Sequence, residues 1–335
     1  MSDIEREEKL PWRLVPAAIR QHVEEILGSS VARGTRVWGG YGPTPTYRLV
    51  LADGKRAFFK GTNQDCTEFA RAAIEREERV YRELSQWISP WSPRFYDTFH
   101  YEDWHILLLD DVGPKSVPPW TPQKGREVTT SIAAFHQSTL GQQLPAWLPQ
   151  PTEFLSDVSW DLVAEGSEQF SAVARLANAA SNDALLWLRV AAPLLSRVTS
   201  SLVTSAGPCA LLHGDIRSDN LRLVQGGACL FDWPEARVGP HEFDLTEFAQ
   251  SVTVESGIEP EQVIAWYSER QAVDAETLDA SVAWWAAFFA DRAWRPDIPG
   301  LPRLRQFQRD QLRVMLLWVA CRLHLPEPTW VATID

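Results

Sequence analysis

The sequence predicts an α+β protein of two lobes, the first rich in β-strands and the second mainly helical. Its 335 residues exceed what one hydrophobic core usually serves. Strand-type patterns dominate up to Gly113, and long helical patterns dominate after it. We therefore expect an N-terminal lobe at residues 1–112, built from a helix and an antiparallel sheet. A helical C-terminal lobe should occupy residues 113–335.

Apolar spacing and turn residues predict the elements of the first lobe. Residues 14–28 have helical apolar spacing and end at Gly28, a residue typical of the position after a helix. The segment RVWGGYGPTPTYRLVLADGKRAFFKG predicts three strands, separated by a Gly/Pro turn and by the Asp53-Gly54 turn. The remaining expected elements of this lobe are a helix at 67–87 and strands at 94–102 and 104–111.

The second lobe begins with a Pro-rich linker, GPKSVPPWTP, at residues 113–122. Helical spacing then predicts helices at 124–140, 151–178 and 182–204. Three short strands are expected around a polar loop, at 209–212, 221–224 and 228–231. From residue 243 onward the pattern is helical again, with an interruption between Pro296 and Pro302.

Charge and composition exclude several classes of function. The net charge of −12 argues against a nucleic-acid partner, and it favours cationic ligands or simply confers solubility. No apolar stretch is long enough to span a membrane before a charge interrupts it, so no membrane partner is expected. The four cysteines form no CxxC pair, and the charged N-terminus does not resemble a signal peptide. We therefore expect a cytoplasmic protein with reduced thiols.

The segment HGDIRSDN, residues 213–220, carries the strongest chemical signal. The Gly226-Gly227 turn that follows predicts a tight hairpin, which would bring Asp232 back beside Asn220. Asp215, Asn220 and Asp232 would then face one small volume. Such oxygen ligands suit Mg²⁺, and a carboxylate that does not bind the metal can take a proton from a hydroxyl nucleophile. An Asp-rich loop taken alone is more often a solvated turn.

This spacing is the one used in kinase phosphoryl transfer. The segment HGDIRSDN…FDW resembles the aminoglycoside phosphotransferase family of small-molecule kinases, which share the protein-kinase-like fold. The resemblance implies that Asp215 is the catalytic base and that Asn220 and Asp232 bind Mg²⁺. It also implies that His213 orients the loop. Asp244, in GPHEFDLTEF, would be a structural carboxylate that anchors the loop.

The first lobe supplies a lysine and a glutamate of the kind that kinases use to hold phosphates. Lys60 lies at the end of the third expected strand, in AFFKG. On the following helix, the pair Arg76-Glu77 resembles the family pattern, so we expect Glu77 to pair with Lys60. Glu78 is the alternative, because the rotation of a helix cannot be fixed from its sequence.

Two further segments are expected to contact the nucleotide. The loop GGYGPT offers backbone N–H groups to phosphate oxygens, through its glycines Gly39, Gly40 and Gly42. Pro45 stands where the protein-kinase loop has its third glycine, so an ordinary Gly-Pro turn is the alternative. By resemblance, the segment LLLDDVG joins the lobes, and the backbone groups of Asp110 and Val112 would contact the nucleotide base.

The sequence therefore predicts an ATP- and Mg²⁺-dependent phosphotransferase, with GTP as an alternative donor. Gly214 replaces the Arg of the protein-kinase H-R-D motif, and no A-P-E segment follows, so a small-molecule hydroxyl is the expected acceptor rather than a protein. An aminoglycoside or another amine-bearing acceptor would suit the acidic chain. A nucleotide-binding pseudokinase is the alternative, and a protein kinase has less support. Carboxylates that could receive an amine, or could be merely solvated, are Asp157, Asp161, Glu165 and Asp291. The oligomeric state stays open.

Overall fold

The computed structural model describes residues 10–37, 44–114, 117–204, 207–225, 227–298 and 301–335. The chain forms two compact units. The first unit combines Met1–Ser116 with Asp219–Glu235, and the second combines Val117–Ser218 with Ala236–Asp335. The segment Asp219–Glu235 thus belongs to the first unit, although its neighbours in the chain belong to the second.

A five-stranded antiparallel sheet forms the first unit, with the strand order β1-β2-β3-β5-β4. Burial alternates along β2, where Tyr47 and Leu49 are buried between half-buried neighbours. This alternation of period two is what a strand with one face on a core requires. The strands are β1 (Val31–Arg36), β2 (Thr46–Leu51), β3 (Arg56–Thr62), β4 (Phe95–Tyr101) and β5 (Trp104–Asp110).

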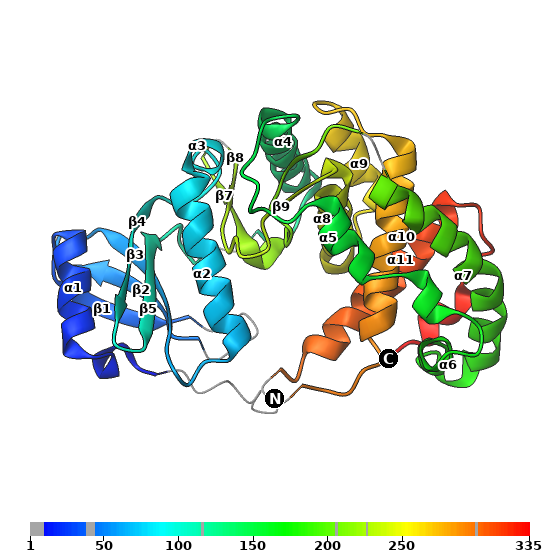
Figure 1. The fold of residues 1–335 in the computed structure, drawn as a ribbon, viewed down its shortest axis with the longest axis horizontal. Helices are drawn as coiled ribbons and strands as arrows, with labels where there is room; N and C mark the ends of the chain where they lie inside the picture. Colours follow the sequence, from blue (N-terminus) through cyan, green and yellow to red (C-terminus); the bar gives the residue numbers. More distant parts are fainter. Residues whose placement is uncertain (1–9, 38–43, 115–116, 205–206, 226, 299–300) are drawn as a thin grey trace. The chain divides into compact units, whose positions relative to one another are not determined.

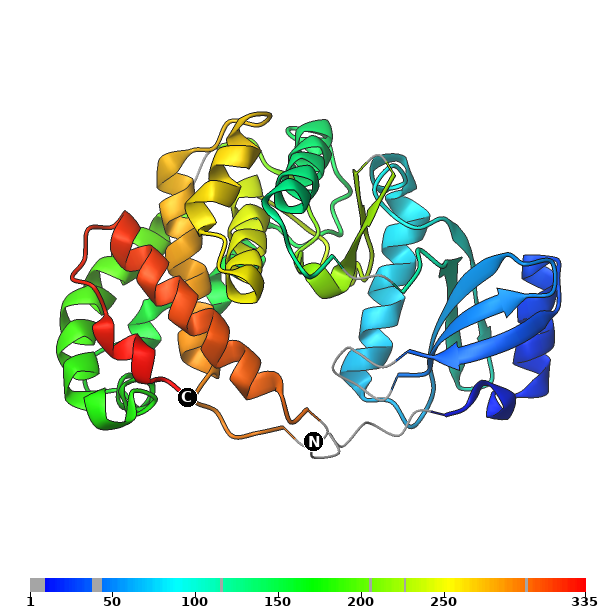
Figure 2. The same ribbon diagram turned by 180° about the vertical axis from the view of Figure 1, so that it is seen from behind.

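Two helices cover the two faces of this sheet (Figure 1). Helix α1 (Ala17–Leu27) buries Ile19 and Val23 in a core shared with Trp104 and Ile106 of β5. It ends at Gly28, whose φ of 68° is the left-handed conformation expected after a helix. Figure 2, from behind, shows the sheet again lying between α1 and the longer helix α2.

Helix α2 (Glu68–Glu83) begins where Thr67 accepts a hydrogen bond from the Ala70 N–H at 3.2 Å. It is followed by the short α3 (Ser85–Ile88). Ile74, Glu77 and Tyr81 are buried on α2, and their spacing of three and four residues forms one face. A buried glutamate on that face needs a partner inside the unit.

The expected hairpin is present in the first unit. Strand β7 (Leu221–Val224) pairs with β8 (Gly227–Leu230), with Leu221 opposite Leu230. The Leu230 N–H donates to the Trp91 carbonyl at 2.6 Å, which ties the hairpin to the residues after α3. Strand β8 ends one residue earlier than the sequence predicts.

The second unit is mainly helical, and the expected helix at 151–178 is wrong. The segment is divided into α5 (Pro151–Phe154), two 3-10 turns and α6 (Glu168–Arg175). Ser159 and Ser167 each accept a hydrogen bond from a backbone N–H further along the chain, at 3.0 Å. Such serine side chains start new helical turns rather than continue an old one. The apolar spacing persists across the breaks, so periodicity alone missed them.

Helix α10 packs against α7, α8 and α11, and α8 is buried for most of its length. The described helices of this unit besides α5 and α6 are α4 (Pro122–Thr139), α7 (Ser181–Thr204), α8 (His241–Ser256), α9 (Pro260–Ser268), α10 (Ala275–Arg292) and α11 (Leu304–Arg322). A two-stranded sheet pairs β6 (Ala210–Leu212) with β9 (Arg237–Gly239). The sequence did not predict β9. None of the described helices combines the length and apolar character that crossing a membrane requires.

Candidate functional site

Lys60 is held by a carboxylate on each side in the first unit. Its Nζ lies 2.5 Å from Glu77 Oε2 and 2.6 Å from Asp232 Oδ1. Strand β3 positions the lysine, helix α2 the glutamate and the segment after β8 the aspartate. The Glu77 side chain is 1% exposed, whereas the Asp232 side chain is 43% exposed. Glu77 therefore serves as a fixed internal partner, and Asp232 also faces solvent.

The charges of this group determine its protonation. Burial alone would lower the pKa of Lys60, but the carboxylates of Asp232 and Glu77 more than offset this and raise it. Burial raises the pKa of Glu77, against the effect of the Lys60 ammonium. Lys60 thus stays a cation at neutral pH, which is the state that binds phosphate oxygens.

Glu78, the alternative partner, does not contact Lys60. Its carboxylate lies 2.7 Å from His105 Nε2 and accepts a hydrogen bond from Arg82 Nε at 2.8 Å. Because consecutive residues of a helix point about 100° apart, only one of Glu77 and Glu78 faces β3. The rotation that the sequence left open is set by the burial of Ile74 and Tyr81 beside Glu77.

The hairpin brings Asn220 and Asp232 to the same end of β7 and β8. The Phe231 N–H donates to the Asn220 carbonyl at 3.0 Å, so Asp232 directly follows a residue that is bonded to Asn220. Asp232 has a φ of 68°, in the left-handed region that Asp tolerates better than most residues. A carboxylate and an amide oxygen are a donor set that suits Mg²⁺, so the residues present fit the expected ion.

The expected nucleotide contacts are only partly described. Gly39, Gly40 and Gly42 lie outside the described residues. The Asp110 N–H is already bonded to the Arg94 carbonyl at 2.8 Å. Within the described ranges, no hydrogen bond engages the backbone N–H or carbonyl of Val112.

The residue after Asp110 holds this segment in place. The Asp111 side chain is 2% exposed and pairs with Arg48. It also accepts a hydrogen bond from the Gly113 N–H at 2.9 Å. These contacts fix the backbone on both sides of Val112.

Asp215 belongs to the second unit, on the loop that follows β6. Its N–H donates to His213 Nδ1 at 3.3 Å, and its carboxylate lies 3.2 Å from Arg217 Nε. One third of the Asp215 side chain is exposed, so the carboxylate can reach a dissolved ligand. Gly214 has a φ of 79°, a conformation that glycine adopts without strain.

Asp244 anchors this loop from the start of α8. Its two carboxylate oxygens accept the backbone N–H groups of His213, at 2.7 Å, and Gly214, at 3.0 Å. His136 of α4 lies 3.2 Å from the same carboxylate and 2.8 Å from the Tyr267 hydroxyl. Burial would raise the pKa of Asp244, but hydrogen bonds from His136 and His213 hold it below the usual value. The predicted loop contact is present.

Sequence reasoning missed two charged residues around Asp215. Glu247 accepts a hydrogen bond from the Ile216 N–H at 3.1 Å, and burial together with the nearby Asp215 raises its pKa well above the usual value. Arg217 lies beside Asp215 and over the Phe307 ring, at 5.4 Å. Glu247 follows Asp244 by three residues on one helix, a spacing that could have indicated a shared face.

We expect the stability of the protein to depend on pH because of Glu242, which lies on the same helix as Asp244 and Glu247. Burial raises its pKa to about 7 from 4.5. The folded chain therefore holds this proton more tightly than the unfolded chain, so the stabilisation is present at low pH and is lost as the pH rises towards 7. At pH 8 the cost to folding is about 1–3 kcal/mol. Glu242→Gln is neutral and can still accept the Asp274 N–H, which lies 2.9 Å from Glu242.

We expect Glu242→Gln to be more stable than the wild type at pH 8 and nearly equal to it at pH 5. Urea denaturation at the two pH values measures the difference. The exposed Glu276→Gln is the control, and its stability should follow that of the wild type at both pH values. A constant difference between Glu242→Gln and the wild type would contradict the assignment.

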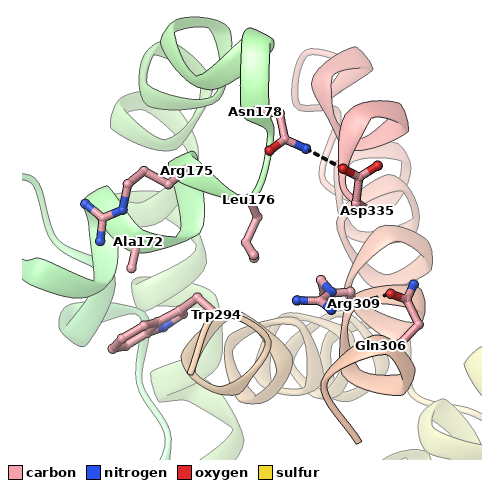
Figure 3. Close-up of a pocket in the computed structure, with 8 residues that line it drawn as sticks. All are labelled: Ala172, Arg175, Leu176, Asn178, Trp294, Gln306, Arg309 and Asp335. Carbon is pink, nitrogen blue, oxygen red and sulfur yellow. Dashed lines mark hydrogen bonds between the residues drawn. The ribbon is translucent and has the colours of Figure 1, made fainter. Parts of the chain in front are cut away.

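A pocket of about 290 Å³ opens in the second unit. Figure 3 shows Leu176 and Arg309 pointing into it, with Trp294 on one side and the hydrogen bond from Asn178 to Asp335 on another. Arg175 also lines it. None of the predicted catalytic or metal-binding residues does. Its lining carries two arginines and the carboxylate of Asp335.

Comparisons with known proteins show the family and the fold of this chain. The sequence model of the phosphotransferase enzyme family matches residues 33–296. No curated protein matches significantly. Among solved structures, amicoumacin kinase hAmiN with AMP-PNP, Ca²⁺ and Ami is 14% identical, with a TM-score of 0.55 over 87% of this chain and 92% of that one.

Two other solved structures share the fold. An aminoglycoside phosphotransferase from Alicyclobacillus acidocaldarius is 12% identical, with a TM-score of 0.57 over 93% of this chain and 97% of that chain. The choline kinase LicA from Streptococcus pneumoniae is 13% identical, with a TM-score of 0.54 over 88% and 97%. The predicted α+β, protein-kinase-like fold is thereby confirmed.

Proposed function

Since the chain belongs to the phosphotransferase enzyme family, we propose that it transfers the γ-phosphate of ATP to a hydroxyl group of a small molecule. The observation that carries the proposal is the group formed by Lys60, Glu77 and Asp232, in which a cation is fixed between a buried and an exposed carboxylate. The support for a nucleotide donor comes from relatives of this fold, which were solved with AMP-PNP. GTP remains an alternative donor.

Each residue has a defined task in the proposed reaction. Lys60, oriented by Glu77, holds phosphate oxygens through its positive charge. Asn220 and Asp232 would hold Mg²⁺, which when bound supplies neutralisation of the charge on the phosphates. The Val112 backbone groups would bind the nucleotide base, with Asp110 beside them. The glycines of the loop at 39–42 would approach the phosphates.

Asp215 is the proposed general base. Its carboxylate would accept the proton of the acceptor hydroxyl as the oxygen attacks the γ-phosphorus, and ADP leaves. The loop is held for this by Asp244, which accepts two consecutive backbone N–H groups from it. Rigid positioning matters because little covalent work is left to the protein in phosphoryl transfer.

The acceptor that we propose is a small molecule that carries both hydroxyl and amine groups. Support comes from the net charge of −12 and from the similarity to an aminoglycoside phosphotransferase and a choline kinase. The carboxylates first considered for the amine are mostly engaged. Glu165 pairs with Arg189, and Asp291 with Arg295. Asp161 accepts a hydrogen bond from Ser196.

An acceptor screen tests the proposal. ADP release is measured with Mg-ATP and a panel of aminoglycosides, macrolides, sugars, amino alcohols and nucleosides, with Asp215→Asn in parallel. We expect one chemical class to stimulate ADP release and the variant to abolish the stimulation. Nucleotide binding without stimulation by any class would favour a nucleotide-binding pseudokinase. Phosphorylation of peptides in preference to the panel would contradict the small-molecule acceptor.

A further inference from the structure

Three metal-ligating side chains meet on the first unit, away from Lys60. They are Glu78 of α2, His100 of β4 and His105 of β5, and their ligand atoms all lie within 4.8 Å of one another. None takes part in the proposed phosphotransfer. His105 is buried, Glu78 is half-buried and His100 is exposed. Solvent therefore reaches the group at His100 and in part at Glu78.

The hairpin of β4 and β5 places the two histidines side by side. His100 and His105 are direct cross-strand partners, and their ring centroids are 4.0 Å apart. Residues directly opposite on one face of an antiparallel pair are close enough for their side chains to act together. Trp104 and Ile106 face the core under α1. Because successive side chains alternate between faces, His105 lies on the opposite face.

Helix α2 supplies the third ligand on that face. Glu78 Oε2 lies 2.7 Å from His105 Nε2, and its other oxygen accepts a hydrogen bond from Arg82 Nε at 2.8 Å. The Thr98 hydroxyl lies 3.1 Å from the same His105 nitrogen. One carboxylate oxygen is thus fixed from behind by Arg82, while the other is aimed at an imidazole nitrogen.

We propose that Glu78, His100 and His105 form a binding site for a divalent transition-metal ion of the zinc class. Two imidazoles and a carboxylate are ligands that Zn²⁺ prefers, whereas Mg²⁺ and Ca²⁺ prefer oxygen alone. Three protein ligands leave a fourth position for water on the exposed side of His100. The Arg82 hydrogen bond is the kind of outer contact that orients a metal-binding carboxylate.

The geometry needs only small adjustments to accept the ion. Metal–ligand distances of about 2.0–2.1 Å place tetrahedral ligand atoms about 3.3 Å apart. The contact between Glu78 and His105 must therefore widen from 2.7 Å, and the exposed His100 must move inward. When the ion binds His105 through Nε2, the neutral ring keeps its one proton on Nδ1, and two metal–ligand bonds replace the hydrogen bond between Glu78 and His105.

The bound ion would join α2 to the hairpin of β4 and β5. Glu77, the partner of Lys60, is the residue next to Glu78 on the same turn of α2. A metal at this site would thus fix the turn of helix that carries the lysine's buried carboxylate. The site itself requires neither nucleotide nor acceptor, so it can be tested independently of the proposed phosphotransfer.

Metal titration of the full chain tests the site. The protein is freed of metal with a chelator and titrated with Zn²⁺ alone by calorimetry, without nucleotide. We expect one tight site per chain. His100→Ala, which alters an exposed side chain, and Glu78→Gln, which keeps the shape, should each weaken binding at least about 10- to 100-fold. Circular dichroism of each metal-free variant checks that it is folded.

The matched control is His22→Ala. His22 is also a histidine of the first unit, on α1, and it lies 3.2 Å from the Glu25 carboxylate on the surface. The His22→Ala variant should bind Zn²⁺ with the affinity of the wild type. Equal affinity in His100→Ala, Glu78→Gln and the wild type would overturn the proposal. A thiolate charge-transfer band with Co²⁺, retained in both variants, would assign the ion to the free cysteines and would also overturn it.

Discussion

Asp215→Asn is expected to lower acceptor-dependent turnover about 100- to 10,000-fold, the range that a general base contributes. The amide cannot take a proton from the acceptor hydroxyl, but it has the shape of the carboxylate. Its backbone N–H bond to His213 and the anchoring of the loop by Asp244 do not involve the altered side chain. The variant should therefore fold normally and bind ATP like the wild type. ADP release and nucleotide titration measure the two quantities separately.

The control for this variant is Asp219→Asn, the same chemical change four residues further along the chain. Asp219 is exposed, and its backbone carbonyl accepts a hydrogen bond from Arg222. The turnover of the Asp219→Asn variant should remain near that of the wild type. Full activity of Asp215→Asn would remove Asp215 from the role of base. A parallel loss of activity in both variants would indicate a nonspecific effect of charge.

Asp232→Asn is expected to abolish the gain in nucleotide affinity that Mg²⁺ confers and to lower turnover by about 100- to 1,000-fold. Asn is chosen because the φ of 68° at this position suits Asn, whereas Ala would be strained there. The change removes one of the two negative charges beside Lys60 and leaves Glu77 in contact with it. Calorimetric titration with AMP-PNP, with and without Mg²⁺, measures the effect.

Glu235→Gln is the matched control for Asp232→Asn. Glu235 lies three residues further on, and its carboxylate lies 3.7 Å from Arg76 at the surface. Exposed pairs of this kind contribute little, so nucleotide affinity should keep its dependence on Mg²⁺. If Asp232→Asn also kept that dependence, Asp232 would not be a metal ligand.

The sequence predicts the first unit well because its signals are local. Gly28 ends a helix, the Asp53-Gly54 pair marks a turn, and the alternation in β2 matches one buried face. The order of elements around Lys60 follows from these patterns. The choice between Glu77 and Glu78 does not, because it depends on which side of α2 the apolar residues Ile74 and Tyr81 bury.

Features that depend on contacts between residues far apart in the chain could not be predicted from the sequence. Strand β9 has only three residues, and it exists because it pairs with β6. The breaks between 151 and 178 arise from serine caps within an unbroken apolar spacing. His100 and His105 lie side by side because of the register of the β4–β5 hairpin, and the positions of the histidines in the sequence do not indicate that register. No residue pattern indicates that the segment Asp219–Glu235 leaves the second unit for the first.

Because the first unit is built from two separate segments of the chain, its parts are synthesised at different times. The ribosome releases the sheet and α2 roughly a hundred residues before the hairpin that completes their unit. At the usual rates of translation this is a delay of about 5–20 s. Through that interval the Trp91 carbonyl lacks its hydrogen bond from the Leu230 N–H, and Lys60 lacks its contact with Asp232. A fragment that ends at Ser116 would be left permanently in this incomplete state, so the first unit cannot be excised as one continuous piece.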